Sequence, residues 1–143
     1  MILYTIGFSQ KSAKEFFDTL TSNHIERLID IRLNNKSQLA GFTNIRHLPY
    51  FLNLHKIEYL YRPEFAPTKE LLNGYKKKAI SWQDYEVMYN KILTERNILT
   101  NINWDVFENA VLLCSEATAD KCHRRLLAEY LAKRNHRIEI KHV

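Results

Sequence analysis

The chain has 143 residues, of which 45% are hydrophobic and 26% are charged. This is the composition of an ordinary globular protein, and the length suits one domain over residues 1–143 with a sizeable core. No apolar run is long enough to cross a bilayer, and the N-terminal residues lack the basic start of a signal peptide. Cys114 and Cys122 are therefore expected to be free thiols. We predict a cytoplasmic protein without membrane association.

The net charge of +5 is unevenly distributed along the chain. Residues 121–143 hold seven Lys and Arg residues against two Glu residues, whereas residues 1–120 balance at fourteen of each sign. A basic terminal segment can attract nucleic acid or another polyanion. For Arg125, Lys133 and Arg134, a solvated helix face is the plainer interpretation.

In the first half of the chain, segments typical of strands alternate with segments typical of helices. Residues 2–7 form the first predicted strand, since they are apolar and rich in β-branched side chains. Ser12 and Glu15 then form a capping box for a helix. The following elements are, in order, a strand, a polar loop, a short helix and a strand, at residues 27–32, 33–44, 48–54 and 58–61.

In the second half, two more residues of capping type open helices. Thr68 precedes a short helix that ends near Lys78, and Ser81 precedes a longer one. Aromatic residues recur at helical spacing in the longer helix, a pattern that fits packing on a sheet better than base stacking. The remaining elements are, in order, a short turn, a strand, a long helix and a strand, at residues 103–109, 110–114, 120–134 and 137–142.

Five strands joined by helical crossovers predict an α/β fold. We expect a three-layer α/β/α sandwich around a mainly parallel sheet of doubly wound type. In such sheets, ligands bind beyond the carboxyl ends of the strands. Polar and ionisable residues follow several of the predicted strands, namely Ser9, Asp30, Arg32, Cys114 and Glu116.

The start of the last long helix concentrates potential chemistry. We take Asp120 as its N-cap, with Thr118 as the competing choice. His123 then falls at the centre of the helix's apolar arc and should point toward the sheet. Cys122 and Arg124 should lie about 100° to either side of it. The unpaired backbone N–H groups of the first turn would favour an anion or a thiolate there.

Spacing excludes several familiar sites. A cysteine phosphatase needs Cys, five residues and then Arg, but the matching positions hold Asp120 and Ala128. Neither C-x-x-C nor H-x-x-x-H occurs, and adjacent Cys and His on a helix point about 100° apart, so we predict no metal site. No P-loop and no G-x-G-x-x-G occur either, and no cofactor is predicted. A Cys–His nucleophile pair requires His123 to fold back, or His47 or His55 to approach, and both routes stay open.

Each of these residues also has a structural interpretation. His123 could be a buried histidine bonded to a carbonyl group, and Arg124 could form a salt bridge with Asp30 or Glu116. Considered together, they favour a functional site. Arg32 beside Arg124 and a helix N-terminus would form a site for an anion such as phosphate.

Taken together, these residues resemble the family known as domain of unknown function 488 (DUF488), along nearly the whole chain. The most specific part is LLCSEATADKCHRRLLAEYL at 112–131, followed by IDIRLNNKS at 29–37, in which Ser37 comes five residues after Arg32. TIGFS at 5–9 and IEYLY at 57–61 also match. The chain departs from the family at Phe8, where histidine is frequent, at Asn35, where proline is frequent, and in a downstream glycine-rich element, here EFAPTKELL.

The resemblance implies a Rossmann-like fold and a pocket, but it supplies no settled reaction. The implied pocket residues are Ser9, Asp30, Arg32, Cys114, Glu116, Cys122, His123 and Arg124. Together with Ser37, these are the predicted site residues.

Three functional hypotheses follow. The first is a small enzyme that binds an anionic ligand, derived from a nucleotide or a nucleic acid, at the edge of the sheet. In it, Arg32 and Arg124 neutralise the anion, Glu116 or Asp30 is the general acid or base, and Cys122 is the nucleophile or a polarising thiol. The second is a non-catalytic module that binds nucleic acid or a protein through the basic C-terminal segment. The third is a redox-sensing thiol pair.

Overall fold

The structure is a computed structural model that describes residues 1–38 and 40–143. Leu39, in the predicted polar loop, lies outside the described residues. Five strands form one parallel sheet in the order β3-β2-β4-β1-β5. Their bounds are β1 (Ile2–Gly7), β2 (Arg27–Asp30), β3 (Glu58–Tyr61), β4 (Ala110–Cys114) and β5 (Glu139–His142). Strand β4 is therefore the centre of the sheet, which confirms the predicted α/β fold.

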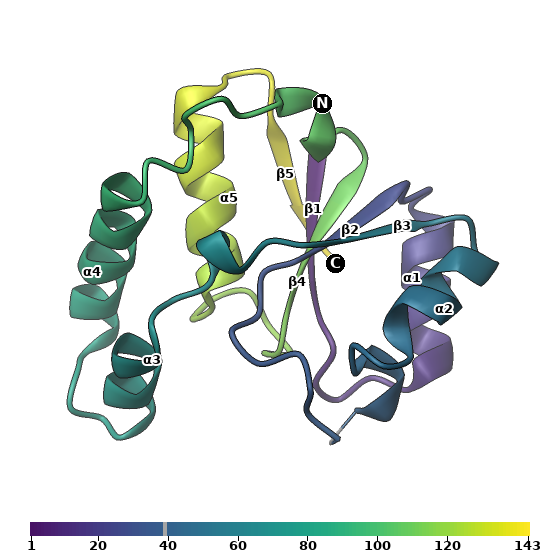
Figure 1. Cartoon of the computed structure of the whole chain (residues 1–143), viewed down its shortest axis with the longest axis horizontal. Helices are drawn as coiled ribbons and strands as arrows, with labels where there is room; N and C mark the ends of the chain where they lie inside the picture. The colour runs from purple at the N-terminus through teal and green to yellow at the C-terminus, as the bar shows by residue number, and fades with distance from the viewer. Residues whose placement is uncertain (39) are drawn as a thin grey trace.

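Helices cover both faces of the sheet, as Figure 1 shows. Helices α1 (Ala13–Ser22) and α2 (Leu48–Leu54) lie on one side, and α3 (Lys69–Lys76), α4 (Trp82–Glu95) and α5 (His123–Arg134) lie on the other. Three short 3-10 turns occur, at η1 (Gly41–Thr43), η2 (Pro63–Phe65) and η3 (Trp104–Phe107). Across residues 1–38 and 40–143, no helix has both the length and the apolar character that crossing a bilayer requires.

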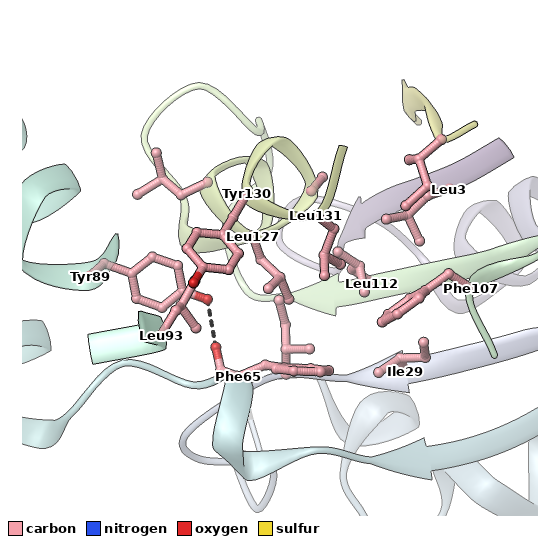
Figure 2. Close-up of a cluster of buried hydrophobic side chains, with 14 of the residues drawn as sticks. Leu3, Ile29, Phe65, Tyr89, Leu93, Phe107, Leu112, Leu127, Tyr130 and Leu131 are labelled. Carbon is pink, nitrogen blue, oxygen red and sulfur yellow. Dashed lines mark hydrogen bonds between the residues drawn. The ribbon is translucent and has the colours of Figure 1, made fainter. Parts of the chain in front are cut away.

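Two buried clusters hold the three layers together. In strand β4, Val111 and Leu113 pack in the cluster of α1 and α2, whereas Leu112 packs in that of α4 and α5. Alternate residues of a strand face opposite sides, so a central parallel strand is apolar throughout. Figure 2 shows the second cluster, where the Tyr89 hydroxyl also donates a hydrogen bond of 2.6 Å to the Phe65 carbonyl oxygen.

The predicted helix caps are confirmed. The Ser12 side chain accepts from the Glu15 backbone N–H, and the Glu15 carboxylate accepts from the Ser12 N–H, which completes a capping box. Thr68 and Ser81 cap α3 and α4 in the same way, each accepting from a backbone N–H three residues on. These three contacts set the start of each helix.

Two strands are shorter than predicted. Strand β2 ends at Asp30, because the Asp30 carboxylate accepts the backbone N–H of Arg32 and turns the chain there. Strand β5 begins at Glu139, because Asn135 accepts the backbone N–H groups of Arg137 and Ile138 in a turn after α5. Both differences arise from a local side chain or turn that competes with strand pairing.

The prediction that Asp120 or Thr118 caps α5 is wrong. The N-cap is Cys122, which has an extended backbone and no side-chain capping bond. Arg124 and Arg125 donate to the carbonyl oxygens of Glu116 and Asp120, respectively, and these bonds hold residues 115–122 outside the helix. The helix therefore begins at His123, and its first turn leaves backbone N–H groups without a side-chain cap.

Candidate functional site

A cavity of about 870 Å³ lies at the carboxyl edge of the sheet. Its walls are the segments that follow β1, β2 and β4, the start of α5, and residues of α3, α4 and their connection. The volume lies within the range of small-molecule sites. The predicted site residues that line it are Ser9, Arg32, Ser37, Cys114, Glu116, Cys122 and His123. Asp30 and Arg124 lie behind this lining and are fully buried.

Cys114 and His123 form a thiol–imidazole pair. The predicted inward orientation of His123 is confirmed, since its side chain is buried and its Nε2 lies 2.9 Å from the carbonyl oxygen of Ile31. A carbonyl group only accepts, so Nε2 is the donor, and in a neutral imidazole Nδ1 is then the acceptor. Nδ1 lies 3.4 Å from the Cys114 Sγ atom. His123 therefore folds back onto the cysteine of β4, and Nδ1 can accept the Cys114 thiol proton.

The two thiols are in direct contact. The Cys122 Sγ atom lies 2.7 Å from Cys114 Sγ and is the hydrogen-bond donor. Burial raises the pKa of the Cys114 thiol, but the bond from Cys122, the backbone N–H groups of Ser115 and Glu116, and the charge of Arg124 outweigh it, so that pKa lies below the ordinary value. Burial, together with the bond to Cys114, raises the pKa of Cys122. Of the two, Cys114 is the thiol that ionises first.

Arg124 is a buried cation next to this pair. Its side chain is 1% exposed, and its guanidinium group donates to the Glu116 carbonyl oxygen, to Thr5 Oγ1 at 3.3 Å and to Cys122 Sγ at 3.9 Å. Among the described residues, no carboxylate lies within 4.0 Å of it, so the salt bridge considered with Asp30 or Glu116 is not formed. The nearby group that can take a negative charge is the Cys114 thiol.

The loop after β4 rests directly on the end of β1. The backbone N–H of Ser9 donates to the Ser115 carbonyl oxygen at 3.0 Å. A Cβ atom added at Gly7 would lie 1.6 Å from the Glu116 carbonyl oxygen and 2.6 Å from Arg124 Nη1. Because real Cβ atoms never approach so closely, only glycine lets the loop and Arg124 pack here.

Asp30 and Arg32 form a buried ion pair. The Asp30 carboxylate accepts from Arg32 Nε at 2.8 Å and from Nη2 at 2.9 Å, and the Tyr59 hydroxyl donates to it at 2.6 Å. Burial and this bond to Asp30 raise the pKa of Tyr59. With its lone pairs engaged by Arg32 and Tyr59, Asp30 holds the guanidinium group in place.

One nitrogen atom of the Arg32 guanidinium group, Nη1, takes no part in the bonds to Asp30. This atom is buried, and within residues 1–38 and 40–143 it has no hydrogen-bond partner. Arg32 lines the cavity, and its guanidinium carbon lies 5.6 Å from the centre of the Phe8 ring. A buried donor without an acceptor is costly, and a ligand oxygen would satisfy it.

The outer wall of the cavity was not predicted. It consists of α3 and α4 residues, among them Tyr75 and Trp82, whose rings lie 5.4 Å apart, together with Lys76 and Lys78. Trp82 packs against the core, as the helical pattern predicts, but it is the first residue of α4 and also lines the cavity, which the pattern does not show. Lys121, on the loop before α5, also lines the cavity.

Cys114, Cys122 and His123 also bring three potential metal ligands within 4.8 Å of one another. The geometric objection to zinc in the sequence analysis does not hold, because Cys122 precedes the helix. A different objection does hold. Two thiolates on a tetrahedral zinc ion lie roughly 3.8 Å apart, given Zn–S bonds of about 2.3 Å, whereas these sulfur atoms are 2.7 Å apart with a guanidinium group alongside. This separation matches neither two zinc ligands nor an ordinary thiol hydrogen bond, and the absence of a metal site stays a prediction.

Two arginines of the basic C-terminal segment are engaged within the fold. Arg124 is buried, and Arg125 pairs with Glu86 at 2.8 Å and with Glu129 at 3.1 Å. Arg134 lies over the Tyr130 ring at 3.5 Å. Lys133, Arg134, Arg137 and Lys141 are exposed, so this segment stays a candidate binding surface.

Fold and site together define a class of protein, the doubly wound parallel α/β domain with a thiol pair at the carboxyl edge of its central strand. The comparison with family models matches residues 12–131 to the domain of unknown function DUF488, and the chain belongs to this family. This confirms the resemblance found in the sequence. Neither the curated proteins nor the solved structures gave a match.

Proposed function

We propose that the protein is a small enzyme that binds an anionic ligand, derived from a nucleotide or a nucleic acid, in the cavity at the edge of the sheet. The observation that carries the proposal is the buried Nη1 atom of Arg32, a residue that lines the cavity, because the described residues supply no acceptor for it. Asp30 fixes the guanidinium orientation from behind. A phosphate oxygen would satisfy the remaining donor.

The charge of the lining supports an anion. Arg32, Lys76, Lys78 and Lys121 contribute positive side chains, whereas Glu116 is the single acidic residue among the described lining residues. A concave site lined by one sign of charge concentrates ligands of the opposite sign. The aromatic wall of Tyr75 and Trp82 offers a surface on which a base can stack.

Cys114 is the better candidate for the nucleophile, in place of Cys122. Its thiol can pass a proton to His123 Nδ1, and the Arg124 charge stabilises the resulting thiolate. Glu116 is exposed at the cavity and can serve as general acid or base, a role that the buried Asp30 is poorly placed to fill. Arg124 then acts through the thiolate and does not touch the ligand.

The experiment is a thermal shift assay with inorganic phosphate, adenosine monophosphate and a short single-stranded oligonucleotide. A ligand at a hundred times its Kd stabilises the folded state by about 2.7 kcal/mol, which raises the Tm of a domain of this size by several degrees. The double variant Lys78→Gln/Lys121→Gln should reduce this shift. The matched control Lys133→Gln/Arg134→Gln removes two charges from the exposed face of α5 and should leave it unchanged.

Two outcomes contradict the proposal. If none of the three anions stabilises the wild-type protein, the cavity is not an anion site. If the shift disappears in the α5 variant and survives in the cavity variant, the module that binds through the basic C-terminal segment is the better hypothesis.

A further inference from the structure

Both thiols of the chain lie in contact at the cavity. Cys114 is 4% exposed and Cys122 is 3% exposed, yet both line the cavity, and their sulfur atoms are 2.7 Å apart. A disulfide bond measures about 2.05 Å, so forming one requires the two sulfur atoms to approach by only a fraction of an ångström. Cys114 is the last residue of β4, and Cys122 is the N-cap of α5. The connecting residues 115–121 belong to no helix or strand and can absorb this movement.

The two thiols have different environments. Cys114 accepts a hydrogen bond from Cys122, and its sulfur atom lies 3.4 Å from His123 Nδ1. The positive charge of Arg124 also lowers the pKa of Cys114. Cys122 is the donor of that bond and has no side-chain role in capping its helix. The thiolate is the nucleophile in thiol oxidation. Because Cys114 ionises more readily, Cys114 is the thiol that attacks the oxidant, and Cys122 is the thiol that then forms the disulfide with it.

The small exposed area at Cys114 restricts the oxidant. A disulfide exchange partner must place its own sulfur atom in line with the attacking thiolate, and the 4% exposure of Cys114 limits this approach for a large partner. A small hydroperoxide can reach the sulfur atom through the cavity. The basic lining and the guanidinium group of Arg124 also favour the oxyanion that leaves when the O–O bond breaks.

We propose that Cys114 and Cys122 form a dithiol–disulfide couple that reduces small hydroperoxides. The inference rests on the proposed function in its use of Cys114 as the reactive thiol. The Cys114 thiolate attacks one oxygen of the hydroperoxide, the O–O bond breaks, and the alkoxide leaves as an alcohol with the proton that His123 took from Cys114. Cys122 then attacks the sulfenic acid at Cys114, an S–S bond forms, and hydroxide leaves as water with the Cys122 proton. One hydroperoxide is reduced, and two thiols are oxidised to a disulfide.

The test uses the reduced full-length chain, one equivalent of hydrogen peroxide, and intact mass measurement after alkylation under denaturing conditions. The wild-type protein should lose about 2 Da and both alkylation sites, and dithiothreitol should restore them. Cys122→Ser should stop at a sulfenic acid on Cys114, which dimedone traps. Cys114→Ser should resist the same dose, and circular dichroism should confirm that both variants fold.

Three outcomes overturn the inference. The first is dimedone labelling of Cys122 in the Cys114→Ser variant as fast as that of Cys114 in the Cys122→Ser variant. The second is oxidation of the wild-type protein to a sulfinic acid without a disulfide. The third is a stoichiometric zinc ion in the purified protein that protects both thiols. The anion assay of the proposed function gives a separate readout. If the disulfide forms but no anion raises the Tm, only the proposed anionic ligand is contradicted. If an anion raises the Tm but no disulfide forms, only the dithiol–disulfide couple is contradicted.

Discussion

Replacing Asp30 with asparagine should strongly destabilise the protein. The Asp30 side chain is 0% exposed, that of its partner Arg32 is 2% exposed, and the carboxylate accepts four hydrogen bonds of 2.6–3.2 Å, three from Arg32 and one from Tyr59. Asparagine keeps the shape but leaves the guanidinium group buried without a counter-charge. Breaking a buried pair in this way costs about 3–5 kcal/mol.

Urea denaturation followed by circular dichroism measures this loss. With an m-value of about 2 kcal/mol/M, the midpoint should fall by roughly 2 M. A matched control lies on the same strand pair, where Arg27 and Glu58 form an ion pair at 2.7 Å with side chains 25% and 53% exposed. Glu58→Gln should cost at most about 1 kcal/mol.

The reasoning is refuted if Asp30→Asn lowers the midpoint no further than Glu58→Gln does. A double variant, Asp30→Leu/Arg32→Met, sharpens the comparison. Because it removes both charges, it should recover much of the stability that Asp30→Asn loses. Failure to recover would mean that packing, and not the unpaired charge, causes the loss.

Three further predictions concern the loop and the thiols. Gly7→Ala should lower the urea midpoint markedly, since its new Cβ would lie 1.6 Å from a carbonyl oxygen, whereas Gly41→Ala, with no atom within 4 Å, should stay near the wild-type value; equal midpoints would contradict the packing argument. The rate of Cys114 alkylation by iodoacetamide should reach half its maximum at a lower pH than for an ordinary cysteine, and Cys122→Ala should move that pH upward by removing a hydrogen bond to the thiolate. The pKa of His142 is lowered from 6.5 by burial and by a neighbouring arginine, so the unfolded chain binds a proton at a higher pH than the folded one. The Tm should therefore fall as the pH drops below about 6.5, and a His142→Asn variant that shows the same slope would remove His142 as its cause.

Most of the fold could be predicted because the signals are local. Capping side chains such as Ser12 and Ser81 act on backbone groups three residues away, so the sequence shows where those helices start. Strand β4 was predicted with its observed bounds, since a buried central strand is a continuous apolar run. The predicted C-terminal end of β2 and the predicted start of β5 were wrong. At the first, a side chain binds the backbone N–H group, and at the second, a turn does.

The site was less predictable, because its contacts join distant elements. The pairing of Cys114 with His123 depends on where α5 begins, and that point depends on how Arg124 holds the carbonyl oxygen of Glu116. The aromatic wall depends on how α3 and α4 lie over the edge of the sheet. Neither arrangement leaves a spacing rule in the chain. A carbonyl partner for His123 and its folding back onto a cysteine were among the alternatives, but the sequence could not decide which contacts form.

No carboxylate of the described residues pairs with Arg124, and this affects the equilibrium between the dithiol and the disulfide. In the reduced protein, the lowered pKa of Cys114 allows a thiolate to form that would balance the buried guanidinium charge. A disulfide between Cys114 and Cys122 is uncharged and would leave that cation without compensation. The fold therefore favours the dithiol over the disulfide. Couples whose reduced form is stabilised in this way are strong oxidants, so a disulfide formed here would be readily reduced by a thiol small enough to enter the cavity.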